Sequence, residues 1–131
     1  MSMADPNKID FENKEYLKLS VADNDEYAKL LNGMLADGER IIQTYKNVRD
    51  GVVFTDRRLI AINVQGITGK KKSVTSLPYS KIQLFTVQTA GVIDIDSELY
   101  VWYAGIGKIT FEFTSRSDVT SICRCMSQCM D

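Results

Sequence analysis

The chain has 131 residues, of which 44% are apolar and 25% are charged, and its formal net charge is −1. This size and composition are typical of one globular domain. The small net charge argues against a dedicated nucleic-acid-binding protein, which would carry a strongly basic surface. The sequence contains no histidine, which excludes Ser/His/Asp and Cys/His catalysis and most zinc sites.

The cysteines and the N-terminal residues bear on the compartment. All three cysteines lie between Cys123 and Cys129, too few and too close together to build a disulfide framework. The first residues lack the apolar core of a signal peptide, and no stretch approaches the roughly 20 apolar residues of a membrane-spanning helix. We therefore expect a cytoplasmic protein.

The first part of the chain predicts helical structure. Residues 1–20 have an irregular apolar pattern, and we expect an arm or short helix there, followed by a single domain over residues 21–131. A helix is expected at about residues 23–35, because Asp23 or Asn24 can cap its start. Its apolar side chains recur at helical spacing. They are Tyr27, Leu30, Leu31, Met34 and Leu35.

From residue 39 onward, short β-branched and aromatic runs alternate with Gly, Asp, Asn and Ser, a pattern typical of strands and turns. Several connections are short enough only for hairpins, so the strands should be antiparallel. In the last run Ile109, Phe111 and Phe113 alternate with polar residues, so one face of that strand should be buried. The seven expected strands span about residues 41–48, 51–55, 58–65, 71–79, 82–89, 97–103 and 106–114.

The period changes again after Thr114, and residues 117–130 are expected to form an amphipathic helix. Ser115 or Ser117 can cap its start. Such a helix would plug the open end of a bent sheet and cover apolar surface there. The residues expected to face the sheet are Val119, Ile122, Cys123, Met126 and Met130.

Over about Leu31–Met130 the chain resembles the bacterial pleckstrin-homology-like (PH-like) domain family. The resemblance rests on the order of short motifs: Gly51–Ile60, Val64–Lys72, Leu77–Ser80, Phe85, Thr89–Gly91, Asp94–Leu99 and Phe111–Phe113. It implies a mostly β fold, a partly open seven-stranded antiparallel β-barrel capped by the C-terminal helix. It also implies a non-enzymatic module, and some members assemble through their barrel edges into homo-oligomeric rings. The resemblance brings no catalytic residue, metal or cofactor.

Lys70, Lys71 and Lys72 form a basic run that could contact a lipid headgroup or another anion. In eukaryotic relatives of this fold, a basic hairpin loop has that role. The alternative is a solvated turn whose lysines protect a strand edge from pairing. Membrane attachment usually takes about four to eight basic residues. Arg57 and Arg58 lie in a different turn, so we do not favour membrane binding.

Two other clusters favour structural over chemical roles. The acidic residues of Asp94–Glu98 recur at strand spacing and could bind a cation, but a polar strand face is the commoner explanation. Cys123 and Cys125 would point about 200° apart on a helix, and no histidine completes a metal site. Cys123 is expected in the core, whereas Cys125 and Cys129 share a face and are expected as accessible thiols.

Tyr100 and Trp102 would share one face of their strand, whose other face is also apolar. Aromatic pairs are common in protein interfaces, although the N-terminal helix could instead cover this pair within the chain. The residues predicted at an oligomer interface are Tyr27, Leu31, Tyr100 and Trp102.

These features predict a non-enzymatic binding or scaffold module that acts through self-association and contacts with other proteins. The expected partner is a second copy of the chain, in a homo-oligomer that a repeated contact can close into a ring. The alternative function is a peripheral binder of phospholipid headgroups at a membrane surface. An enzyme with carboxylate or thiol chemistry is disfavoured, because no nucleophile has a visible base.

Overall fold

The computed structural model describes residues 11–65, 71–89, 96–114 and 119–130. Its strands are β1 (Glu15–Ala22), β2 (Ile41–Lys46), β3 (Gly51–Thr55), β4 (Arg58–Gln65), β5 (Lys71–Pro78), β6 (Ile82–Thr89), β7 (Ser97–Tyr103) and β8 (Gly107–Phe113). The helical elements are α1 (Ala28–Leu31), the 3-10 turn η1 (Tyr79–Lys81) and α2 (Val119–Cys129).

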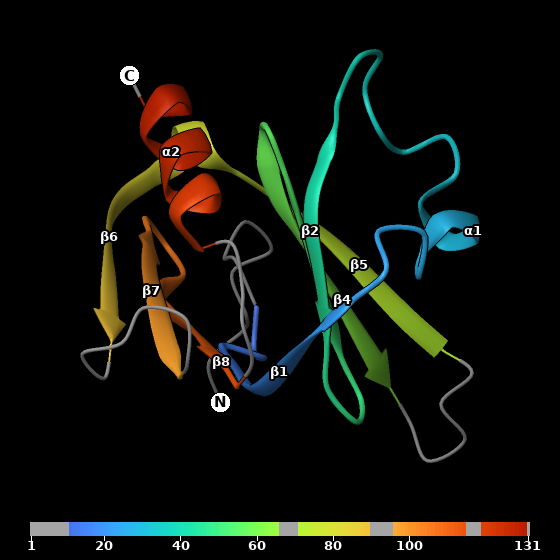
Figure 1. Cartoon of the computed structure of the whole chain (residues 1–131), viewed down its shortest axis with the longest axis horizontal. Helices are drawn as coiled ribbons and strands as arrows, with labels where there is room; N and C mark the ends of the chain where they lie inside the picture. The colour runs from blue at the N-terminus through green and yellow to red at the C-terminus, as the bar shows by residue number, and fades with distance from the viewer. Residues whose placement is uncertain (1–10, 66–70, 90–95, 115–118, 131) are drawn as a thin grey trace, which may run out of the picture.

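The strands form one curled sheet, in the order β5-β4-β3-β2-β1-β8-β7-β6 (Figure 1). Neighbouring strands are antiparallel except for β1 and β8, which run parallel. The two edges of the sheet are therefore β5 and β6. The predicted mostly β, partly open barrel with a C-terminal helix is confirmed. The sheet is mixed, however, and has eight strands where the sequence predicts seven antiparallel ones.

The additional strand is β1, so the prediction of an arm or short helix was wrong for Glu15–Ser20. Tyr16 and Leu19 are fully buried between β2 and β8. The register with β8 shifts between these two residues, and Lys18 there has a φ of +54°. This bulge places the buried residues three positions apart. It therefore removes the alternation by which a strand is recognised in a sequence.

The helix predicted at residues 23–35 is also much shorter than expected, because only Ala28–Leu31 is α-helical. The chain leaves this single turn at Asn32, and Gly33 follows with a φ of +82°. Leu31 is 3% exposed and packs with Val53, Ile60 and Ile62 in a small cluster of buried residues. α1 therefore covers the outer face of β3 and β4, which explains why β4 is apolar on both faces.

The main core lies inside the curl and is closed at one end by α2 (Figure 1). Val119, Ile122 and Met126 are buried, as predicted from their spacing, whereas Cys123 is only partly buried. Below the helix, the fully buried Tyr79 donates a hydrogen bond from its hydroxyl to Thr55 O at 2.7 Å. The aromatic side chains of this core include Tyr16, Tyr45, Phe54, Tyr79, Tyr103, Phe111 and Phe113.

One ion pair fixes the segment that follows α1. The Arg58 guanidinium donates to both carboxylate oxygens of Glu39, at 2.9 and 2.8 Å, and also to Met34 O at 2.7 Å. Burial opposes ionisation of the Glu39 carboxyl group, but donors from Arg58, Thr55 and Ala36 outweigh it and lower its pKa to about 2. Arg58 is therefore committed to a structural contact and does not contribute to an open basic patch.

Candidate functional site

An aromatic surface lies on the outer face of β6 and β7. Tyr100 and Trp102 have ring centroids 6.3 Å apart, and Lys108 Nζ lies 5.2 Å from the centroid of Tyr100. Leu84 is directly opposite Trp102 and is 50% exposed. Both aromatic side chains are half-buried and belong to neither cluster of buried residues. We call Leu84, Thr86, Tyr100 and Trp102 the β6–β7 surface.

The strand alternation predicted for β7 is confirmed, because Leu99, Val101 and Tyr103 are buried on its inner face. The alternative that the N-terminal helix covers Tyr100 and Trp102 does not hold for α1. That helix packs instead on the other half of the sheet, through Leu31. Leu31 therefore offers almost no surface to a partner. Tyr27 is half-buried beside the same cluster.

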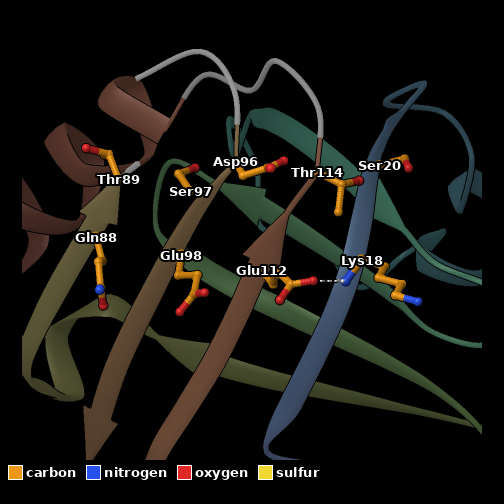
Figure 2. A pocket seen from close by; sticks show the side chains of 9 residues that line it. All are labelled: Lys18, Ser20, Gln88, Thr89, Asp96, Ser97, Glu98, Glu112 and Thr114. Carbon is orange, nitrogen blue, oxygen red and sulfur yellow. Dashed lines mark hydrogen bonds between the residues drawn. The ribbon is translucent and has the colours of Figure 1, made fainter. Parts of the chain in front are cut away.

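A polar hollow of about 650 Å³ adjoins the β6–β7 surface. Figure 2 shows that Glu98 and Glu112 project into it from neighbouring strands. They are directly opposite each other in the ladder. The backbone N–H of Lys18 donates to Glu112 Oε1 at 3.1 Å, and the Lys18 side chain points away from that carboxylate (Figure 2).

The Tyr100 hydroxyl donates to Glu98 Oε2, and this hydrogen bond raises the pKa of the tyrosine. The aromatic surface and the polar hollow are thus joined through one contact. Of the acidic run considered in the sequence, Asp96 and Glu98 line the hollow, and Asp94 lies outside the described residues. Within the described part of the chain, no group of three or more His, Cys, Asp and Glu side chains is arranged to hold a metal ion.

The basic run does not join this site. Lys71 and Lys72 are exposed at the start of β5, at the opposite edge of the sheet, and Lys70 lies outside the described residues. Lys72 pairs in register with Val64, whose carbonyl accepts a hydrogen bond from Arg49 Nη2 at 2.9 Å. Arg49 is thus a further cation at that end of the sheet, and the sequence analysis did not single it out.

Comparison with known proteins settles the family. The sequence model of the bacterial PH domain matches residues 10–130, nearly the whole chain. The chain belongs to the bacterial PH domain family.

Two relatives from Bacillus subtilis (strain 168) are uncharacterized proteins. YozO is 34% identical over 72% of this chain and 82% of its own length. YjqA is 51% identical over 55% of this chain, and the match spans 58% of YjqA. Their descriptions name no ligand or partner.

Two crystal structures resemble this bacterial PH domain. A DUF1696 family protein with a pleckstrin-homology domain, from Shewanella loihica PV-4, has a TM-score of 0.71 at 36% identity, covering 88% of this chain and 99% of that one. A pleckstrin homology domain from Shewanella amazonensis SB2B has a TM-score of 0.57 at 40% identity, covering 84% and 90%. The resemblance expected from the motif order is confirmed.

The thiols of this bacterial PH domain are poorly suited to act as nucleophiles. Burial raises the pKa of Cys123 to about 11 and also raises the pKa of Cys125. Cys129 donates from its thiol to Asp56 O at 3.3 Å. All three cysteines are half-buried, so Cys125 and Cys129 are less accessible than the helical pattern indicated.

Leu84 and the free edge of β6 were missed by the sequence analysis. A signal was present, because the eight residues Ile82–Thr89 contain no charged residue and no proline. That composition is unusual for a strand at the edge of a sheet. It could be interpreted only once the strand order had placed β6 at the edge.

Proposed function

We propose that this bacterial PH domain is a non-enzymatic binding and scaffold module that self-associates through the free edge of β6 and the adjoining β6–β7 surface. The observation that carries the proposal is the contrast between the two edges of the sheet. β5 has Lys71 and Lys72 at one end and Pro78 at the other, which are residues that discourage edge pairing. β6 has no such residue along its length.

The exposure of β6 supports the same conclusion. Five of its last six residues, Leu84, Thr86, Val87, Gln88 and Thr89, are exposed. A strand from a second copy could therefore pair with the free N–H and C=O groups of this edge. Leu84 of β6 and Trp102 of the neighbouring β7 would add apolar contact to the hydrogen bonds.

The symmetry of the assembly depends on which surface meets β6. Two β6 edges that pair with each other would give a closed dimer. A β6 edge that meets a different surface of the next copy would give a ring when the rotation closes. We favour the cyclic arrangement, in which the β6 edge and the adjoining β6–β7 surface of one copy together contact a different surface of the next copy.

We propose a non-enzymatic module because the side chains present are poorly suited to catalysis. The chain has no histidine, and the pKa values of Cys123 and Cys125 are raised by burial. In the described ranges, the acidic side chains near the aromatic pair engage Tyr100 and the Lys18 backbone. These contacts favour recognition over bond-breaking chemistry.

The test is the mass of the purified protein by light scattering and sedimentation velocity at micromolar concentrations. The unmodified chain should be a homo-oligomer, and Trp102→Glu should dissociate it because it places a charge beside the edge. Thr86→Lys should have the same effect from β6 itself. Val48→Glu is the matched control, since Val48 is fully exposed on the β2–β3 turn and away from the proposed contact.

Circular dichroism would show that each variant is folded. A monomeric mass for the unmodified chain would refute self-association. Variants at Trp102 and Thr86 that keep the full oligomeric mass would place the interface elsewhere.

A further inference from the structure

The inner wall of the barrel changes from apolar to polar along β4 and β5. The pairs in register are Leu59 with Leu77, then Ala61 with Thr75, then Asn63 with Ser73. The first of these pairs lies in the core with Tyr79, near α2. The last lies at the far end of the same wall. Polar side chains at inward positions need hydrogen-bond partners, whereas the packed core at the other end of the barrel is apolar.

A hollow of about 340 Å³ opens at this polar end. Four separate parts of the chain contribute to it: residues 11–13 before β1, the β2–β3 turn, β4 and β5. Its volume is at the lower end of the range for small-molecule sites, about 300–1,000 Å³. The ligand that it could hold is therefore small.

Asn63 is the buried polar side chain of this hollow. It is 8% exposed, and its Oδ1 accepts a hydrogen bond from the Tyr16 hydroxyl at 3.1 Å. Its Nδ2 group has no hydrogen-bond partner among the described residues. A buried amide that leaves its donors unused is costly, and a water, an ion or a ligand that accepts from those donors would remove the cost. The unused donors call for an acceptor oxygen.

Arg49 supplies a cation at the rim of the same hollow. One of its five N–H donors is used by Val64 O at 2.9 Å, which fixes the guanidinium beside the hollow. The turn that carries it is held by Asn47 Oδ1, which accepts from the backbone N–H groups of Arg49 and Asp50 at 3.0 and 2.7 Å. The cation is thus presented by an ordered turn.

Asp50 is already engaged by the protein. Its two carboxylate oxygens accept hydrogen bonds from Asn13 Nδ2 at 3.2 Å and from the Val64 backbone N–H at 3.3 Å. The charged side chains of the lining are Arg49, Asp50 and Glu12. With one cation and two anions, this lining repels a dianion such as hydrogen phosphate about twice as strongly as a monoanion, so a singly charged ligand that contacts the Arg49 guanidinium is favoured over a dianion.

We propose that this hollow binds a small carboxylate, whose oxygens accept hydrogen bonds from Asn63 Nδ2 and from the Arg49 guanidinium. Thr75, with its hydroxyl group, lines the same wall. The site is formed by residues 11–13, the β2–β3 turn, β4 and β5, and it shares no residue with the β6–β7 surface. It therefore does not depend on self-association.

The experiment is a titration of the ¹⁵N-labelled full chain with sodium acetate, followed by NMR of the Asn63 side-chain amide. Sodium chloride at equal ionic strength and inorganic phosphate are the comparison salts. Acetate at millimolar concentrations should shift the Asn63 amide signals in a saturable way. Arg49→Gln should weaken acetate binding about tenfold or more, because it removes a charged donor.

Lys71→Gln is the matched control, because it removes another exposed cation at the same end of the sheet that does not line the hollow. This variant should bind acetate as the unmodified chain does. The proposal is overturned if acetate does not shift the Asn63 amide beyond the effect of chloride. It is equally overturned if phosphate binds as tightly as acetate, or if Lys71→Gln weakens acetate binding as much as Arg49→Gln does.

Discussion

Gly51 illustrates how one residue position can determine local packing. The ring of Tyr27 lies where a Cβ atom on Gly51 would have to be placed. Gly51 begins β3 and pairs with Lys46, so the ring rests directly on the backbone of the β2–β3 hairpin. The sequence pattern predicted Tyr27 on the apolar face of a helix. In the structure it anchors the segment around α1 to the sheet.

Gly51→Ala should therefore destabilise the protein by about 1–3 kcal/mol, the usual cost of overpacking a filled site. The measurement is the free energy of unfolding in urea. The control is the same substitution in a Tyr27→Ala background, where the clash is absent and the cost should largely disappear. Equal costs in both backgrounds would mean that Tyr27 does not occupy the space above Gly51.

The residues of the proposed sites were harder to predict than the core. Asn63 follows Leu59 and Ala61 at inward positions of β4, so its polarity on that face was visible in the sequence. Its hydrogen bonding was not visible, because its Oδ1 accepts from Tyr16, which is 47 residues away. Leu31 was predicted at an interface, but it is buried against β3 and β4 by a turn that helical periodicity does not describe.

At the level of secondary-structure elements, regular periodicity was a reliable guide and irregular periodicity was not. α2 was predicted from residues spaced three and four apart, and three of these are buried. β1 was missed because its bulge at Lys18 breaks the alternation. The expected helix before β2 is only one turn long. Tyr27, Leu30, Leu31 and Leu35 pack against the sheet without a longer helix, and Met34 is 50% exposed.

The contribution of α2 can be measured with a single substitution. Ile122 is fully buried in the main core, so Ile122→Ala should cost about 2–5 kcal/mol of unfolding free energy. Ser127→Ala, on the exposed face of the same helix, should change stability by no more than about 0.5 kcal/mol. Similar effects of the two substitutions in urea unfolding would show that α2 does not close the barrel.

At the level of the whole molecule, charge differs between the two edges of the sheet. The net charge is −1, and Arg58 forms an ion pair with Glu39, so that residue is not available to bind an anion. Within the same part of the chain, no helix has the length and hydrophobicity to cross a membrane. The strand order makes β5, which has lysines, and β6, which has none, the two edges of the sheet. Local patterns could not predict this order, because β1 joins β2 to β8 in the middle of the sheet.

We predict that the protein does not sediment with vesicles rich in phosphatidylserine. Lys70, Lys71 and Lys72 would each contribute about 1 kcal/mol near an anionic surface, too little for lasting attachment without apolar insertion. The variant with all three lysines changed to Glu should behave in the same way. Clear sedimentation that is lost in this variant would instead support binding to lipid headgroups.

The position of β1 has a consequence for the order in which the protein folds during synthesis. β1 lies between β2, which follows it closely in the chain, and β8, which is far from it in the chain. Lys18 of β1 donates from its backbone N–H to Glu112 of β8, and these two residues are 94 positions apart. While the ribosome is still translating the middle of the chain, β2–β5 can form hairpins, but β1 has only half of its final partners. Tyr16 and Leu19 cannot pair with Phe111 and Phe113 until these two residues have been synthesised. Long-range pairing of this kind slows folding and lengthens the time for which a nascent strand is open to the wrong neighbour.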